Sequence, residues 1–179
     1  MDAVFYLMLL LNFGFGVLTV VFLSIVETEP SSKALAITFP AHTYGSEENG
    51  AEWRLNFDNS YLAVEVRYDV MFEKQFGFAR GGKLPGLFGG KGNTGGNKPT
   101  GKDGFSARMM WRGNGRVVQY VYYPDQPEHF GHDMPWTDPA TGEDLIFTSG
   151  TWHNVVHQLK LNTPGERNGV LRTYFDGQL

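Results

Sequence analysis

The sequence of 179 residues contains no cysteine. The chain therefore has no disulfide framework, no thiolate zinc site and no cysteine nucleophile. It also lacks a basic excess, because 15 Lys and Arg stand against 19 Asp and Glu, which gives a net charge of −4. Proteins that bind nucleic acid usually carry a basic excess or a basic stripe, so we expect no nucleic-acid partner. An acidic polymer could bind only through a local basic site.

A basic stretch is also missing at the N-terminus, where a long apolar run begins. Residues 4–26 carry no charge, Asp2 precedes them and Glu27 follows. The run is long enough for a membrane span and longer than most signal-peptide cores. We therefore predict a signal peptide or signal anchor over residues 1–26 and a polar linker over residues 27–36. The rest of the chain is then secreted, or held outside the cell by a membrane anchor through residues 4–26.

Helical periodicity is absent after residue 30, whereas glycine (23 residues) and aromatic residues (15%) are abundant. Many turns and aromatic segments are typical of an all-β sandwich. The clearest strand covers residues 61–72, where apolar and polar residues alternate as in a half-buried strand. We predict one all-β domain over residues 37–179. Because the chain stops directly after the turn residues Asp176 and Gly177, we expect this domain to be incomplete at its C-terminus.

A glycine-rich stretch, residues 76–90, places a single cation in unusual surroundings. Lys83 lies between the pair Gly81-Gly82 and the run Leu84-Pro85-Gly86. Glycine allows a positive φ and the close approach of a ligand, and proline fixes its own φ. We interpret the stretch as a loop, which either presents Lys83 to a ligand or is a solvated surface turn. The stretch alone leaves both interpretations open.

Residues 105–111 and 116–123 flank Gly113-Asn114-Gly115 and predict a β-hairpin. A three-residue loop places Arg108 opposite Tyr120 and Ser106 opposite Tyr122, and directly opposed residues point to the same face. One face thus combines a cation, a hydroxyl and two phenols. The other face is mostly apolar, so we predict that it packs in the core. The alternative is a solvated face with tyrosines at cross-strand positions.

This combination fits the chemistry of a uronic-acid polymer. Arginine binds a carboxylate bidentately, and tyrosine can donate or accept a proton on a rigid ring. A nearby Lys83 would lower the pKa of a tyrosine. Elimination requires a neutralised substrate carboxylate, a base for the C5 proton and an acid for the departing O4. We expect no metal and no cofactor, because the spacing of His129, His132 and Asp133 in a polar loop matches no strong ligand motif.

Three motifs resemble polysaccharide lyase family 14, which comprises alginate and glucuronan lyases built on a β-jelly roll. They are Gly81-Gly82-Lys83-Leu84-Pro85-Gly86-Leu87, Ser106-Ala107-Arg108-Met109-Met110-Trp111-Arg112 and Tyr120-Val121-Tyr122, and the resemblance covers roughly residues 37–177. It implies an antiparallel β-jelly roll that continues past the turn at Asp176.

The resemblance also implies site residues and a substrate class. Lys83, Tyr120 and Tyr122 would be catalytic, and Ser106 and Arg108 would bind substrate. Either Lys83 or a tyrosine would be the base that acts on an anionic polysaccharide such as alginate or glucuronan. The alternatives are a non-catalytic carbohydrate-binding β-sandwich and an inactive lyase fragment. We expect the protein to be a monomer.

Overall fold

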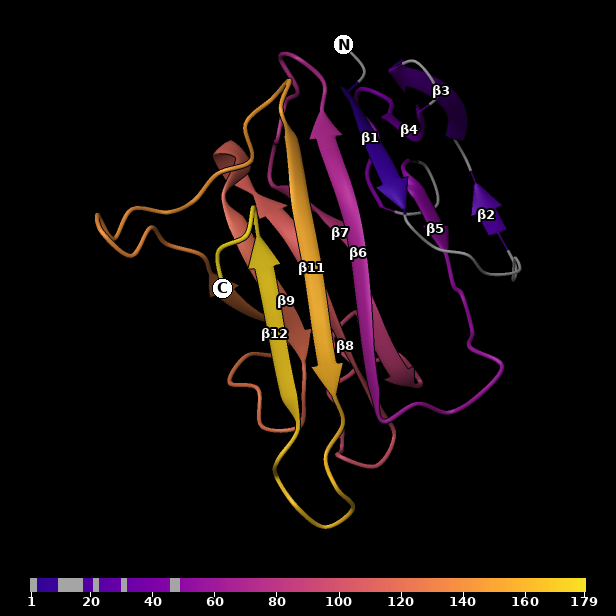
Figure 1. The fold of residues 1–179 in the computed structure, drawn as a ribbon, viewed down its shortest axis with the longest axis vertical. Helices are drawn as coiled ribbons and strands as arrows, with labels where there is room; N and C mark the ends of the chain where they lie inside the picture. Colours follow the sequence, from indigo (N-terminus) through magenta and orange to yellow (C-terminus); the bar gives the residue numbers. More distant parts are fainter. Residues whose placement is uncertain (1–2, 10–17, 21–22, 30–31, 46–48) are drawn as a thin grey trace. The chain divides into compact units, whose positions relative to one another are not determined.

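The computed structural model describes residues 3–9, 18–20, 23–29, 32–45 and 49–179 (Figure 1). These residues form strands and connecting loops, with one short 3-10 turn at Gly113–Gly115. The chain divides into two compact units, one made of Met1–Phe76 with Ser149–Leu179 and the other of Gly77–Thr148. Each unit contains an antiparallel sheet, so the predicted all-β class is confirmed.

The first unit contains a six-stranded sheet in the order β12-β11-β6-β1-β4-β3. In Figure 1, β12, β11 and β6 lie side by side as long arrows. The strands of this sheet are β1 (Ala3–Leu9), β3 (Leu23–Glu29), β4 (Ser32–Phe39), β6 (Ala63–Phe72), β11 (Trp152–Lys160) and β12 (Val170–Phe175). A separate pair is formed by β2 (Leu18–Val20) and β5 (Ala51–Trp53).

The strand predicted over residues 61–72 is β6, which begins two residues later than predicted. Its alternation has the expected consequence, because Tyr68, Val70 and Phe72 are buried whereas Glu65 and Arg67 are exposed. β6 pairs with β11 along the whole length of β11, from Trp152 opposite Met71 to Lys160 opposite Ala63. A half-buried strand of this kind stabilises a sheet through its apolar face.

The apolar run at residues 4–26 contributes strands to the described structure. Its described parts lie in β1, β2 and β3. Residues 27–36, which we predict as a linker, include the end of β3 and most of β4, and these two strands pair with each other. Among the described residues, no helix has the length and apolarity needed to cross a membrane. Residues 1–2, 10–17 and 21–22 lie outside the described residues, and the signal or anchor stays a prediction.

The second unit contains a four-stranded sheet in the order β10-β9-β8-β7. Its strands are β7 (Gly81–Gly90), β8 (Gly104–Arg112), β9 (Val117–Tyr122) and β10 (His132–Pro135). The predicted hairpin register is confirmed, because Arg108 pairs with Tyr120 and Ser106 with Tyr122. The three-residue connection uses left-handed backbone at Asn114 (φ 60°) and Gly115 (φ 80°), as expected for a short hairpin loop.

The glycine-rich stretch around Lys83 is an edge strand, so its interpretation as a loop was wrong. β7 pairs with β8 from Gly81 to Gly90, and a bulge between Lys83 and Gly86 takes Leu84 and Pro85 out of the ladder. Proline is tolerated there because a bulged residue needs no ladder hydrogen bond. A Cβ on Gly82 would lie 2.1 Å from Cζ2 of Trp111. Glycine at this position therefore allows close strand packing.

Candidate active site

One face of the second sheet collects the predicted site residues. Lys83 lies opposite Met110, which lies opposite Val118. The other cross-strand sets on this face are Ser106 with Tyr122, and Arg108 with Tyr120 and Asp133. Opposed side chains of antiparallel strands share a face. The structure thus brings all five predicted residues, Lys83, Ser106, Arg108, Tyr120 and Tyr122, to one face of three adjacent strands.

The middle of this face is buried, so the alternative of a solvated tyrosine face was wrong. Ser106 is 0% exposed, Tyr122 1% and Tyr120 7%. Two segments that follow the strands make hydrogen bonds to these side chains, namely residues 91–103 and residues 124–131. Lys83 is exposed and Arg108 is half-buried. The face therefore combines two buried phenols with two cations that solvent can reach.

The two phenols form a hydrogen-bonded pair. The hydroxyl oxygens of Tyr120 and Tyr122 lie 3.4 Å apart, and the rings meet edge to face with centroids 5.6 Å apart. Each hydroxyl also accepts a backbone hydrogen bond, at 3.0 Å from the N–H of Gly96 to Tyr122 and at 2.9 Å from the N–H of Gly131 to Tyr120. Two different loops therefore fix the positions of the two oxygens.

The surroundings shift the pKa values of the two phenols in opposite directions. Burial, together with the hydrogen bond to Tyr122, raises the pKa of Tyr120 to about 12. Burial also acts to raise the pKa of Tyr122, but hydrogen bonds from Tyr120 and backbone N–H groups and the charge of Lys83 outweigh it, so that this pKa falls below its usual range. Tyr122 is thus the phenol that ionises more readily, and Tyr120 keeps its proton.

The loop over Tyr122 is held by two anchors. The hydroxyl of Ser106 donates to the carbonyl of Asn93 at 2.6 Å. The carboxylate of Asp103 accepts from the backbone N–H of Thr100 at 2.8 Å and from its hydroxyl at 2.9 Å, which lowers the pKa of Asp103. These contacts hold the glycine-rich loop in the conformation that presents the N–H of Gly96.

The segment over Tyr120 is shaped by a buried amide. Gln126 is 2% exposed, and its Nε2 donates to the carbonyl of Phe130 at 2.6 Å and to that of Glu128 at 2.9 Å. The chain then passes close to both phenols at Gly131, where a Cβ would lie 2.6 Å from ring atoms of Tyr120 and of Tyr122. Only glycine allows the backbone to approach the rings this closely.

Sequence reasoning missed an ion pair on the same face. The guanidinium of Arg112 donates to both carboxylate oxygens of Asp133, at 2.8 Å and 2.6 Å, and lies 5.3 Å from the centre of the Tyr120 ring. The hairpin pattern could have placed Arg112 here, since it shares parity with Arg108. Asp133 was assigned to a polar loop together with His132, whereas both residues lie in β10. No periodicity marks this four-residue strand.

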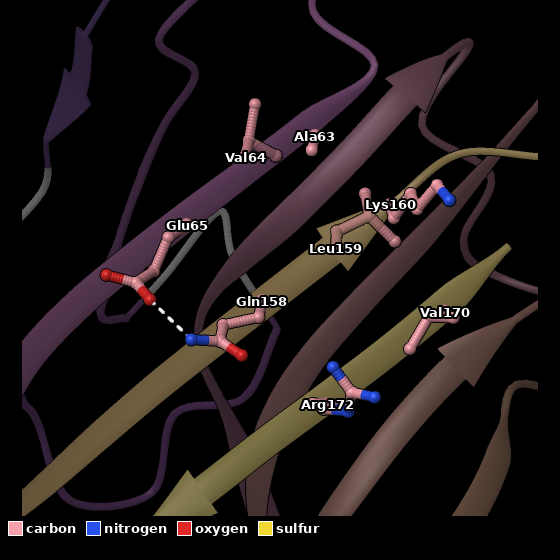
Figure 2. Close-up of a pocket in the computed structure, with 8 residues that line it drawn as sticks. All are labelled: Ala63, Val64, Glu65, Gln158, Leu159, Lys160, Val170 and Arg172. Atoms are coloured by element: carbon pink, nitrogen blue, oxygen red, sulfur yellow. Dashed lines mark hydrogen bonds between the residues drawn. The ribbon is translucent and has the colours of Figure 1, made fainter.

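The described residues offer no other centre of this kind. Among them, no three His, Cys, Asp or Glu side chains gather as a metal site would require. A hollow of about 550 Å³ lies on β6, β11 and β12 of the first unit, and Figure 2 shows Gln158 donating to Glu65 beside it. This hollow is lined by Ala63, Val64, Glu65, Gln158, Leu159, Lys160, Val170 and Arg172 and contains no phenol.

Known proteins resemble the chain in sequence and in structure. The family model Polysaccharide lyase 14 matches residues 27–179. Exolysin of Paramecium bursaria Chlorella virus 1 is 28% identical over 190 residues, which cover 89% of this chain and 27% of Exolysin. The alginate lyase Aly36B is 35% identical, with a TM-score of 0.62 over 74% of this chain and 55% of that protein. The chain thus spans about a quarter and about half of these two proteins.

Two further solved structures share the fold. The PL-14 alginate lyase from Aplysia kurodai is 26% identical, with a TM-score of 0.61 over 86% of this chain and 69% of that chain. The alginate lyase vAL-1 from Chlorella virus is 23% identical, with a TM-score of 0.66 over 87% of this chain and 69% of that chain. The predicted antiparallel β-sandwich of jelly-roll type is confirmed by these similarities.

Proposed function

Because the chain belongs to polysaccharide lyase family 14, we propose that it is a carbon–oxygen lyase that cleaves a uronic-acid polymer by β-elimination. The observation that carries the proposal is the pair of Tyr120 and Tyr122, whose pKa values shift in opposite directions on a face that also holds Lys83 and Arg108. Alginate is the first substrate to test, because mutants of Aly36B have been solved in complex with alginate oligosaccharides. Glucuronan is the second.

The reaction requires a neutralised substrate carboxylate. The guanidinium of Arg108 can bind a carboxylate with two hydrogen bonds, and the ammonium of Lys83 adds a second positive charge. Withdrawing charge from the carboxylate makes the adjacent C5 proton more acidic. Ser106 was predicted to bind substrate; we propose a different role for it here, because its buried hydroxyl donates to the carbonyl of Asn93. In this proposal Ser106 anchors the loop and Arg108 binds the carboxylate.

Proton transfer is assigned to the two phenols. The phenolate of Tyr122 removes the C5 proton, the electron pair forms the C4–C5 double bond, and the C4–O4 bond breaks. Tyr120 gives its proton to the departing O4, so that one chain ends in an unsaturated uronate and the other in a hydroxyl. Tyr122 then carries the proton taken from C5 and Tyr120 is left as a phenolate, and transfer of one proton from Tyr122 to Tyr120 across their 3.4 Å contact restores both groups. We favour Tyr122 over Lys83 as the base because the N–H of Gly96 stabilises its phenolate.

The test is the ultraviolet absorbance of the unsaturated product. We expect the purified chain to release it from alginate, and Lys83→Ala and Tyr122→Phe to lower its rate by about 100-fold or more. Lys160→Ala, which removes an exposed cation from the first unit, is the matched control and should retain activity. Product that persists in both site variants contradicts the site assignment. Alginate binding without product favours the alternative of a carbohydrate-binding β-sandwich.

We also propose that the protein is exported, with residues 1–26 as a signal peptide or signal anchor. The support is the uncharged apolar run of residues 4–26, which is long enough for a membrane span and longer than most signal-peptide cores. Expression of the full chain in a secreting host, followed by fractionation and N-terminal sequencing of the product, tests this. A chain that stays in the cytoplasm with Met1 intact contradicts export.

A further inference from the structure

We propose that Arg112 and Asp133 form a positioning pair that keeps Tyr120 protonated and fixed as the proton donor. The inference rests on the proposed function and extends it to two residues that do not themselves carry out the chemistry. It assigns a role to an ion pair beside Tyr120 that the reaction above leaves unused.

The geometry of the pair is specific. Nε of Arg112 donates to one carboxylate oxygen of Asp133 at 2.8 Å, and its terminal nitrogen donates to the other at 2.6 Å. Both side chains are 28% exposed. A bidentate, partly buried pair is stronger and better ordered than a surface ion pair. The pair joins β8 to β10 across the intervening strand β9, which carries Tyr120.

Each member of the pair neighbours Tyr120. The guanidinium carbon of Arg112 lies 5.3 Å from the ring centre, within the range of a cation–π interaction. Asp133 is the direct cross-strand partner of Tyr120. Asp133 also follows two residues after Gly131, whose N–H donates to the Tyr120 hydroxyl at 2.9 Å. Fixing Asp133 therefore fixes the backbone amide that orients the phenol.

The charges of the pair act on Tyr120 in opposite directions. Arg112 alone would favour the phenolate of Tyr120, and Asp133 alone would favour the neutral phenol. Together they hold the ring in place while their opposite charges offset each other, so that Tyr120 keeps the proton that it donates to O4. Of the titratable and charged groups near Tyr120, Arg112 and Tyr122 act on it directly, and Arg108 and Asp133 are its cross-strand partners. Lys83 acts on Tyr122, Glu128 acts on Arg112, and His129 lies beside Gly96 in the segment that covers the phenols. Because the pair contains one charge of each sign, a substitution can leave either a net positive or a net negative charge beside Tyr120.

The experiment compares three substitutions. Asp133→Asn leaves the positive charge of Arg112 near Tyr120 without a counter-charge, and Arg112→Met leaves the negative charge of Asp133 without one. Arg112→Lys keeps the positive charge but cannot make the bidentate hydrogen bonds of the guanidinium. We expect kcat to fall by about 10- to 100-fold for Asp133→Asn and Arg112→Met, with a smaller loss for Arg112→Lys and little change in KM. The alkaline limb of the pH–rate profile should move to lower pH in Asp133→Asn and should not do so in Arg112→Met.

A second ion pair of the same unit serves as the control. Arg116 and Asp144 lie 3.8 Å apart, with side chains 40% and 46% exposed. Arg116→Lys and Asp144→Asn should leave kcat and the pH profile unchanged. A loss of kcat without a shift of the alkaline limb in Asp133→Asn, or an equal loss in the control variants, overturns the proposal, since either result means that the pair only stabilises the fold.

Failure of the proposed function can be told apart from failure of this inference. If the wild-type chain releases no unsaturated product, the proposed function is contradicted. The pKa of Tyr120 can still be followed by NMR of ring-labelled tyrosine during a pH titration. A lower pKa in Asp133→Asn than in the wild type supports the pair as the control on this phenol, and an unchanged pKa overturns it.

Discussion

Replacing Gly82 by alanine tests whether close packing in β7 positions Lys83. A Cβ at Gly82 would lie 2.1 Å from Cζ2 and 2.3 Å from Cη2 of Trp111. Carbon atoms in contact normally lie about 3.5–4.0 Å apart, so the new methyl group overlaps the ring by more than about 1 Å. Trp111 has little room to move, because it is 3% exposed and its Nε1 donates to the carbonyl of Phe78 at 3.0 Å.

The size of the effect follows from this overlap. Overpacking a buried site costs about 1–3 kcal/mol, and loss of the indole hydrogen bond adds about 1 kcal/mol. A total of about 2–4 kcal/mol corresponds to a decrease in Tm of about 4–16 °C for a domain of this size. If β7 moves away instead, Lys83 moves with it. In that case we expect kcat/KM on alginate to fall together with the stability.

The assay is thermal and denaturant unfolding followed by circular dichroism, with lyase rates on the same samples. Gly77→Ala is the matched control, since a Cβ there meets nothing within 4 Å and its stability change should stay within about 0.5 kcal/mol. Trp111→Phe removes the overlapping ring atoms, so Gly82→Ala should cost less in that background. A cost below about 0.5 kcal/mol, or an equal cost in both backgrounds, refutes the packing argument.

Two further predictions concern proton transfer and the loop over the phenols. Because the pKa of Tyr122 is lowered and that of Tyr120 is raised to about 12, kcat/KM should rise with pH from neutrality, level off in the alkaline range and fall only near the pKa of Tyr120; an acidic optimum contradicts this. Asp103→Asn should speed hydrogen exchange of the Gly96 amide at constant pH. In the wild type the protection of this amide, relative to its intrinsic exchange rate at each pH, should fall as pH drops below about 4, since a carboxyl with a lowered folded pKa stabilises only while ionised. Exchange that is independent of Asp103 contradicts the loop anchor.

Local pattern was sufficient for the hairpin. The positions of Gly113 and Gly115 predict a three-residue loop, and parity then places Ser106, Arg108, Tyr120 and Tyr122 on one face, as the structure has them. This works because an antiparallel pair is fixed by its loop length and by the two-residue period of the strand. The alternation in β6 was readable for the same reason.

Other features depend on partners distant in the sequence. The stretch around Lys83 reads as a loop because of its glycines and Pro85, yet it becomes strand β7 through its pairing with β8. From the sequence, Asp133 is predicted to be a loop residue, whereas in the structure it accepts a hydrogen bond from Arg112, which lies 21 residues earlier. Local composition indicates neither β8 as the partner of β7 nor Arg112 as the partner of Asp133. Glycine and proline indicate how freely the backbone can bend, but they do not indicate which strand will pair with it.

The sequence by itself therefore determined the all-β class and the set of side chains that share one face of the hairpin, since both follow from short-range periodicity. Only the tertiary structure decided that the two phenols are buried, that Gly96 and Gly131 hold their oxygens, and that their pKa values diverge. The reason is physical: burial and hydrogen bonding by loops far along the chain set the free energy of each phenolate, and no local pattern encodes which loop will cover which ring.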